Sequence, residues 1–398
     1  MRISTANAYE ASIDSLMQRQ RELSEVQVQL TSGKRVNRAS DDPAAAARAE
    51  RALARSALSE ASQRTAEASR TMMSLTEGAL GEAGELMQQI RETMVASGNP
   101  SYGDSERLSL AQKIEGLREQ LLNLANRHDG AGGYLFGGQG SSQPPFVDAP
   151  GGVQFRGTGG QVVTAGEDKL PLSSDGRAAW LSARTGNGVF ETRAITSTGS
   201  AWIDAGQVTQ PGALTGSSYS VQFSASGSTT TYSVLRDGAA TAQSNLPFTG
   251  GKAIEIDGLA VTIKGSPAAG DEFQMAPATP GLSVFDVMDR AVAALKTPLR
   301  SGAQIAQSIA FDLRDVDASL GQLQSARAMA GDALNRIDGV SSHLETMKLQ
   351  ASVDRSNAED LDMVHAISDF QNKQTGYDAA LKSYSMVQRM SLFQYLNL

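Results

Sequence analysis

The sequence predicts a mainly α-helical protein with an inserted antiparallel β domain between two helical arms. Residues 137–281 hold 24 of the 39 glycines and 9 of the 12 prolines in the 398-residue chain, whereas good helix formers dominate on both sides. Apolar residues in the arms recur at helical spacing, and those in the middle alternate as in strands. The predicted architecture combines terminal coiled-coil helices, a long helical-bundle rod and an antiparallel β knob.

The N-terminal arm contains two predicted helices. The first spans residues 8–32, and Gly33 stands where a glycine commonly ends a helix. Its apolar stripe consists of Ile13, Leu16, Leu23, Val26 and Leu30. Asp42 and Pro43 predict the start of the second helix, because aspartate is a good N-cap and proline fits the first helical position.

The second helix meets no strong stop signal before residues 98–100. Gly78, Gly81 and Gly84 are its weak point, since glycine costs about 1 kcal/mol relative to alanine inside a helix. The sequence leaves open whether the helix bends there. A third amphipathic helix is predicted over residues 104–128.

After the glycine-rich middle, Ser283 caps a short helix that Pro298 ends, and the final arm shows a coiled-coil pattern. Met363, Phe370, Tyr377 and Tyr384 are seven residues apart, and Ile367 and Leu381 lie on the neighbouring row. We expect these rows to pair with the first helix and with neighbouring copies. The predicted assembly interface is Ile13, Leu16, Leu23, Leu30, Met363, Ile367, Phe370, Tyr377, Leu381, Tyr384 and Leu392.

The middle of the chain has the pattern of strands. Tyr219, Val221 and Phe223 alternate, and Asp257-Gly258 is a hairpin signal between apolar runs. Three domains are therefore predicted. They are a terminal coiled-coil domain (1–33 and 363–398), a helical bundle (42–136 and 282–362) and the inserted antiparallel β domain (137–281).

Composition excludes several classes of function. The net charge of −8 disfavours nucleic acid as a partner, and no apolar run is long enough for a membrane span. Without cysteine there is no disulfide, thiolate zinc site or cysteine nucleophile. The start of the chain lacks the apolar core of a cleaved signal peptide. These absences remove several enzyme classes. Together with the motifs and the family resemblance described below, they lead us to predict no enzyme activity, no catalytic residue, no metal and no cofactor.

The polar clusters favour structural interpretations. His128, His343 and His365 are scattered and form no metalloprotease motif. The acidic residues Glu359, Asp360 and Asp362 are predicted to begin a helix, where carboxylates are stabilised by the helix dipole.

Several segments resemble the bacterial flagellin family of axial proteins. Residues 32–44, SGKRVNRASDDPA, are similar to the family signature, carried by Gly33, Arg35, Asn37, Asp41 and Asp42. Residues 374–381 (QTGYDAAL) and 391–396 (SLFQYL) resemble the tail of the hook-associated members that join hook to filament, and residues 132–138 (GGYLFGG) resemble their closing turn. Residues 205–276 look like a β module of hook-associated proteins.

The resemblance implies a structural subunit, exported by the flagellar type III apparatus and located outside the cell at the hook–filament junction. Its implied partners are further copies of itself in a ring, the first hook-associated protein, flagellin and a flagellar export chaperone. Filament flagellin itself is the alternative within the same class. An enzyme or adhesin acting through the central domain is the remote alternative.

Overall fold

The computed structural model describes the backbone of residues 3–165, 168–226 and 229–396, and the side chains from Glu10 to Met386 outside 166–167 and 226–228. The chain divides into two compact units. The first consists of Met1–Arg64 with Val340–Leu398, and the second of Thr65–Gly339. The helices are α1 (Ile3–Ser32), α2 (Pro43–Ser97), α3 (Asp104–Ala125), α4 (Gly176–Trp180), α5 (Val284–Lys296), α6 (Gly302–Glu359) and α7 (Met363–Leu396), with the 3-10 turn η1 (Pro211–Ala213).

Local signals place the helix ends. α1 ends before Gly33, whose φ of 69° lies in the left-handed region that glycine tolerates. Asp42 accepts a hydrogen bond from the Ala45 N–H at 3.0 Å and so caps α2. Ser283 caps α5 through the N–H groups of Phe285 and Asp286. The predicted starts of α2 and α5 are confirmed.

α2 runs without interruption through Gly78, Gly81 and Gly84. A Cβ atom at Gly81 would lie 3.4 Å from the guanidinium carbon of Arg327 on α6, and one at Gly84 would lie 4.0 Å from Leu320. Arg327 reaches across to pair with Glu77 at 2.6 Å. Two of the three glycines therefore lie where α6 side chains approach α2 closely.

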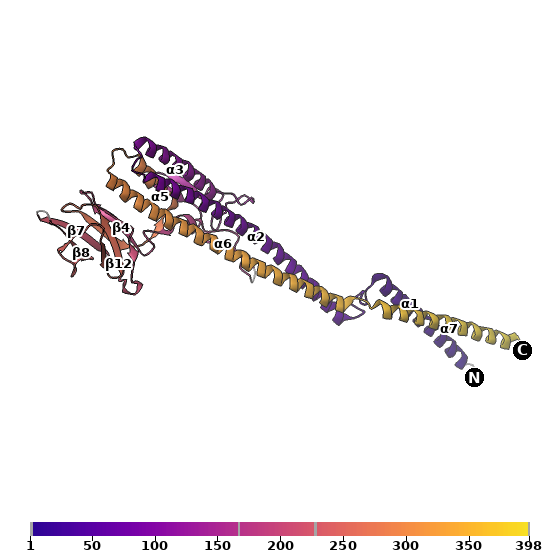
Figure 1. Ribbon diagram of the computed structural model, residues 1–398. Helices are drawn as coiled ribbons and strands as arrows, with labels where there is room; N and C mark the ends of the chain where they lie inside the picture. The colour runs from indigo at the N-terminus through magenta and orange to yellow at the C-terminus, as the bar shows by residue number, and fades with distance from the viewer. Residues whose placement is uncertain (1–2, 166–167, 227–228, 397–398) are drawn as a thin grey trace. The chain divides into compact units, whose positions relative to one another are not determined.

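In the first unit, α1 and α7 lie side by side and antiparallel (Figure 1). Ile3 and Leu396 consequently lie at the same end of the pair. α2 and α6 contribute residues 43–64 and 340–359 to this unit, where Arg55 pairs with Asp354 at 3.4 Å and Lys348 with Glu60 at 2.8 Å.

In the second unit, α3 and α5 pack together beside α2 and α6 (Figure 1). Their apolar core includes Ile90, Ile114, Leu121, Met288 and Leu323. This core also contains residues that the sequence placed in the β insert. Phe146 and Trp180 are fully buried in it, and the Trp180 ring stacks on Phe285 with centroids 5.9 Å apart.

The segment predicted as one insert, 137–281, is therefore divided between two cores. Its first part contributes the hairpin of β1 and β2, α4 and β3 to the helical core. A separate core begins at Phe190 and is built from strands. The strands are β1 (Phe146–Ala149), β2 (Gly152–Phe155), β3 (Ala183–Arg184), β4 (Phe190–Thr196), β5 (Trp202–Ile203), β6 (Gln207–Val208), β7 (Tyr219–Ser226), β8 (Thr229–Arg236), β9 (Ala239–Ala240), β10 (Leu246–Pro247), β11 (Ala253–Ile256), β12 (Leu259–Lys264), β13 (Glu272–Pro277) and β14 (Pro280–Leu282).

The β module, residues 190–277, contains two antiparallel sheets. One has the order β10-β8-β7-β13-β4 with β9 beside β8, and the other has β11-β12-β5 with β6 beside β12. Tyr219, Val221 and Phe223 share the buried face of β7, as predicted. Asp257 and Gly258 both have positive φ and turn β11 into β12, which confirms the hairpin. The mainly α-helical fold with an inserted antiparallel β domain is confirmed.

One face of α6 holds the β module. The side-chain amide of Gln307 donates to the Ile203 carbonyl and accepts from the Ile203 N–H, both at 2.9 Å. Arg314 donates to the Thr192 carbonyl at 3.0 Å, and Phe311 packs against the module's core. Residues 307, 311 and 314 lie on one helix face because they are four and three apart.

Candidate assembly interface

The α1–α7 pair contains a half-buried apolar seam. Val26 and Ala366 are its most buried described side chains. Seven residues of the predicted interface are half-buried in this pair, namely Ile13, Leu16, Leu23, Leu30, Phe370, Tyr377 and Tyr384. Four of these seven residues came from the three-four spacing of α1, and three came from the seven-residue spacing of α7.

Three other predicted residues lie on an outward-facing row of α7. Met363 is 45% exposed, Ile367 47% and Leu381 40%. Val364 is also strongly exposed beside them. Leu392 lies outside the residues whose side chains are described. α7 thus has two apolar rows, and the outer row of Met363, Ile367 and Leu381 remains accessible in the single chain.

Small residues that sequence reasoning did not single out shape the seam. A Cβ atom at Gly376 would lie 2.9 Å from a guanidinium nitrogen of Arg19 on α1, so a larger residue would displace that side chain. Ala366 is buried, and Ala380 is half-buried. The sequence signal for these small residues was their helical spacing at Ala366, Gly376 and Ala380. The larger apolar residues of the same segment determined the predicted interface instead.

The family-signature residues form a joint between the helices of the first unit. The Arg35 N–H donates to the Glu359 carbonyl at 2.7 Å, and the Leu361 N–H donates to the Gly33 carbonyl at 3.0 Å. The Arg35 guanidinium donates to the Ala358 carbonyl at 2.8 Å and contacts Asp42 at 3.3 Å. We call residues 33–42 with 358–361 the clamp, because these hydrogen bonds join the α1–α2 connection to the α6–α7 connection.

The polar signature residues hold the clamp's loop in shape. Asp41 accepts hydrogen bonds from the N–H groups of Asn37 and Arg38, at 3.1 and 2.8 Å. The Asn37 amide donates to the Lys34 carbonyl at 3.2 Å. The Ala45 N–H and the Arg35 guanidinium hold the pKa of Asp42 below its usual range. All five signature residues are therefore brought together, in a structural arrangement of main-chain and charge-assisted hydrogen bonds.

The acidic residues near this joint differ from the sequence prediction. Glu359 ends α6 and pairs with Lys34 at 3.1 Å and Arg355 at 2.7 Å. Asp360 follows α6 and forms a β-bridge with Lys34. Only Asp362 begins a helix, accepting hydrogen bonds from the N–H groups of Val364 and His365. The prediction that all three begin a helix was wrong, because the cluster spans the break between α6 and α7.

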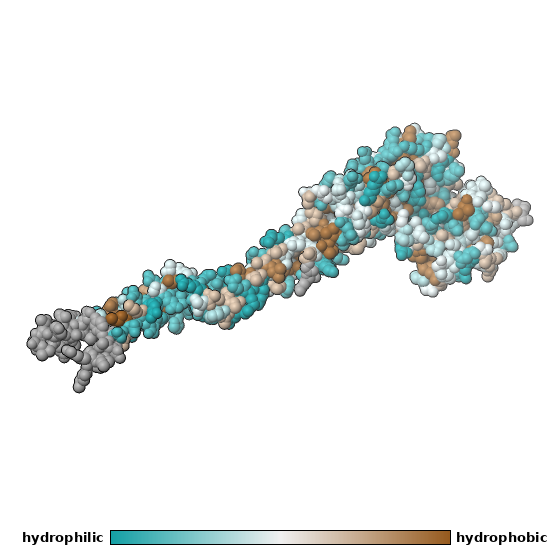
Figure 2. Space-filling model, turned by 180° about the vertical axis from the view of Figure 1, so that it is seen from behind, coloured by the Kyte–Doolittle hydropathy of each residue, from teal (hydrophilic) through white to brown (hydrophobic). Residues whose placement is uncertain are grey.

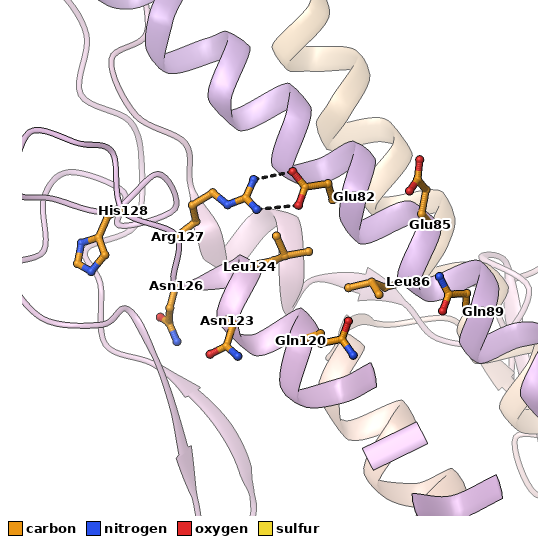
Figure 3. A pocket seen from close by; sticks show the side chains of 10 residues that line it. All are labelled: Glu82, Glu85, Leu86, Gln89, Gln120, Asn123, Leu124, Asn126, Arg127 and His128. Atoms are coloured by element: carbon orange, nitrogen blue, oxygen red, sulfur yellow. Dashed lines mark hydrogen bonds and ion pairs between the residues drawn. The ribbon is translucent and has the colours of Figure 1, made fainter. Parts of the chain in front are cut away.

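A groove of about 600 Å³ lies between α2 and α3 in the second unit (Figure 3). Leu86 of α2 and Leu124 of α3 face each other between the two helices, and Gln89, Gln120 and Asn123 also line the groove (Figure 3). At one end, Arg127 forms two hydrogen bonds with Glu82, at 2.7 and 2.8 Å. The Arg127–Glu82 ion pair and the two facing leucines indicate packing between α2 and α3, and they do not suggest a catalytic site.

A cluster of charges surrounds Asp312 on α6, next to the residues that hold the β module. Burial raises the pKa of Asp312 to about 7, against the attraction of Arg290, Arg300 and Arg314 and aided by repulsion from Asp315. Asp315 takes two of these arginines, pairing with Arg290 at 2.6 Å and Arg314 at 2.8 Å. Two of the three arginines that attract Asp312 are therefore already paired with Asp315.

We expect Asp312→Asn to remove a pH dependence of stability. The unfolded carboxyl ionises above its usual pKa of 3.8, whereas the folded one keeps its proton up to about pH 7. Folding therefore takes up a proton in this window, and stability falls as pH rises. Urea denaturation at pH 5.5 and pH 8 should show that the parent loses about 2 kcal/mol more than the variant. Equal losses in both chains would contradict this assignment.

The described residues hold neither a membrane-spanning helix nor a cluster of metal ligands. Within residues 3–165, 168–226 and 229–396, no helix is long and apolar enough to cross a membrane. The same ranges contain no group of three or more histidine or acidic side chains arranged to hold a metal ion. On the face shown in Figure 2, apolar side chains form small separate patches among hydrophilic ones.

Comparison with protein families gives three matches along the chain. The bacterial flagellin N-terminal helical region matches residues 3–141, and the bacterial flagellin C-terminal helical region matches residues 313–396. Between them, the D2-like domain of flagellar hook-associated protein 1 matches residues 193–277. That range falls within the β module and leaves the first part of the insert outside it.

Individual relatives agree with these matches. The chain is 26% identical to flagellar hook-associated protein 3 of Salmonella typhimurium, over 99% of both chains. The crystal structure of hook-associated protein 3 from Legionella pneumophila is similar with a TM-score of 0.71 and 26% identity, over 76% of this chain and 97% of that one. The Xanthomonas campestris protein FlgL is 30% identical with a TM-score of 0.69, over 77% of this chain and 99% of that one. On these grounds the chain belongs to the family of flagellar hook-associated protein 3, FlgL.

Proposed function

We propose that this chain is the structural subunit that forms a ring of copies joining the flagellar hook to the flagellin filament. The observation that carries the proposal is the outer row of Met363, Ile367 and Leu381, which stays exposed after α7 has paired with α1. An apolar row on a helix that already has one partner is available for another helix. Full-length similarity to hook-associated protein 3 favours the junction subunit over filament flagellin.

The proposed partners follow from the position of such a ring. One side meets the first hook-associated protein and the other meets flagellin, so the subunit lies outside the cell and reaches it through the flagellar export apparatus. The β module is similar to a domain of the first hook-associated protein, since residues 193–277 match its D2-like domain. We propose a structural role rather than catalysis, in keeping with the named relatives.

Electron microscopy of cells that lack this chain tests the proposal. We expect hooks without filaments and flagellin released into the medium. Restoring the gene on a plasmid is the control and should restore filaments. Normal filaments in cells without the chain would contradict the junction role.

We further propose that α7 is the segment bound by an export chaperone before assembly. Its outer row and the seam residues Phe370 and Tyr377 offer apolar side chains along one helix. A truncation ending at Ala358 should lose binding to the chaperone in a pull-down, whereas a chain that lacks only the β module should keep it. Equal binding by the truncated and full-length chains would contradict this assignment.

A further inference from the structure

The loop between α5 and α6 presents a leucine in an unusual setting. We call residues 297–301 the tip loop. Leu299 in this loop is 93% exposed, the highest value among the large apolar side chains described. Its φ is 57°, in the left-handed region that a bulky residue rarely adopts. Leucine therefore gains no burial here and adopts a strained backbone conformation.

Hydrogen bonds fix the tip loop in place. The Leu299 N–H donates to Asp104 at the start of α3, at 3.2 Å. Arg300 donates to the carbonyls of Ala294 and Gln304, at 3.1 and 2.6 Å. Ser301 caps α6, with its hydroxyl accepting from the Gln304 N–H and its N–H donating to the Gln304 side chain. Leu299 is consequently held outward by a loop bonded to α3, α5 and α6.

The same unit carries a groove in which two leucines face each other. Leu86 of α2 and Leu124 of α3 are its apolar lining residues, and polar and charged side chains surround them (Figure 3). A closed ring or helical turn of identical subunits needs a heterologous contact, in which one patch meets a different patch on the next copy. The exposed Leu299 and the α2–α3 groove are two different patches on one chain, and they could form a heterologous contact of this kind between copies.

We propose that Leu299 of one copy docks into the α2–α3 groove of the next copy, as a lateral contact in the ring. This inference rests on the proposed ring of copies. It identifies the second patch needed for assembly in addition to the outer row of α7. Backbone strain at a fixed, exposed residue is then explained by a function in the assembled state.

The positions of the two patches predict a stagger between neighbours. Asp104, which holds the tip loop, starts α3, whereas Gln120 and Leu124 of the groove lie 16 to 20 residues further along the same helix. At 1.5 Å per residue, adjacent copies with parallel α3 helices are displaced by roughly 25–30 Å along that axis. Copies displaced in this way lie on a helical path, so the proposed ring of copies is a turn of a helix and is not planar.

Cysteine cross-linking tests the contact, because the chain has no cysteine of its own. The variant Leu299→Cys with Asn123→Cys, a position that lines the groove, should give a ladder of linked copies when junctions isolated from filamented cells are treated with a bis-maleimide. Each single variant should give no ladder. The matched control is Leu299→Cys with Asn335→Cys, since Asn335 is exposed on α6 away from the groove. We expect no ladder from it.

Substitution of Leu299 gives an independent measurement. Leu299→Gly should melt at or above the temperature of the parent chain, because glycine accepts positive φ, yet leave most hooks without filaments. Leu299→Met keeps an apolar side chain and should retain filaments. Filaments grown normally by Leu299→Gly, an absent ladder in filamented cells, or a cross-link to another flagellar protein would each overturn the inference. These outcomes leave the junction role intact, which fails only if cells without the chain grow filaments.

Discussion

Replacing both Ile367 and Leu381 by aspartate should leave cells with hooks but without filaments. Both side chains lie on the outer row of α7 and are nearly half exposed in the single chain. Because 47% of Ile367 and 40% of Leu381 remain to be covered, burial in a neighbouring subunit would contribute about 1 kcal/mol for each. An aspartate there would also bring an unpaired charge into an apolar contact, which costs more. Loss of assembly should therefore be nearly complete. Filament counts by electron microscopy and swimming in soft agar measure it.

The same double variant should still fold. More than half of each side chain is covered in the single chain, so each substitution should lower the free energy of unfolding by about 1 kcal/mol, a loss that leaves the chain folded. The matched control is Asn372→Asp, which is also exposed on α7 but lies about 140° round the helix from Ile367. It should keep filaments. Normal filaments in the double variant, or an equal defect in the control, would remove the outer row from the assembly interface.

Removing residues 187–277 should spare the helical unit, whereas removing 137–281 should unfold it. The shorter deletion leaves the pair of β3 and β14, where the Thr185 N–H donates to the Thr279 carbonyl at 3.0 Å. Two glycines can therefore join Gly186 to Ala278 as a short hairpin loop. The longer deletion removes Phe146 and Trp180 from the helical core, and losing one large buried aromatic side chain costs about 3–5 kcal/mol.

Circular dichroism and urea denaturation distinguish the two deletions. The shorter one should keep the helical signal and a cooperative transition, and the longer one should lose cooperative unfolding, because total stabilities are only about 5–15 kcal/mol. Identical transitions in both would mean that the first part of the insert does not belong to the helical core. Filaments in cells carrying the shorter deletion would further show that the β module is dispensable for joining hook to filament.

Local chemistry made the helix ends and the hairpin predictable. Gly33, Asp42 and Ser283 mark helix ends through bonds within a few residues, and Asp257-Gly258 sets its own turn. The sequence carries no comparable local signal for contacts between residues that are far apart in the chain. Arg35 meets Ala358 across 323 positions, so the sequence identified the clamp's residues as a family signature but did not predict the contacts they make.

The limits of the heptad pattern are visible in α7. Two neighbouring apolar rows satisfy the same spacing, and only the position of α1 decides that Phe370 and Tyr377 face inward while Ile367 and Leu381 face outward. The insert boundary failed for a related reason. Phe146 and Trp180 sit in a glycine-rich stretch typical of strands and loops, and nothing local indicates that α5 supplies their partner Phe285.

The clamp has a mechanical consequence for a subunit of a rotating organelle. Two segments connect the terminal helices to the rest of the chain. Residues 33–42 connect α1 to α2, and residues 360–362 connect α6 to α7. The two segments are cross-linked by the main-chain bonds of Gly33 and Arg35 and by the Arg35 side chain. A twisting load that enters through α7 is thus shared by the two connecting segments, residues 33–42 and 360–362. Because hydrogen bonds join these segments, neither can rotate independently of the other.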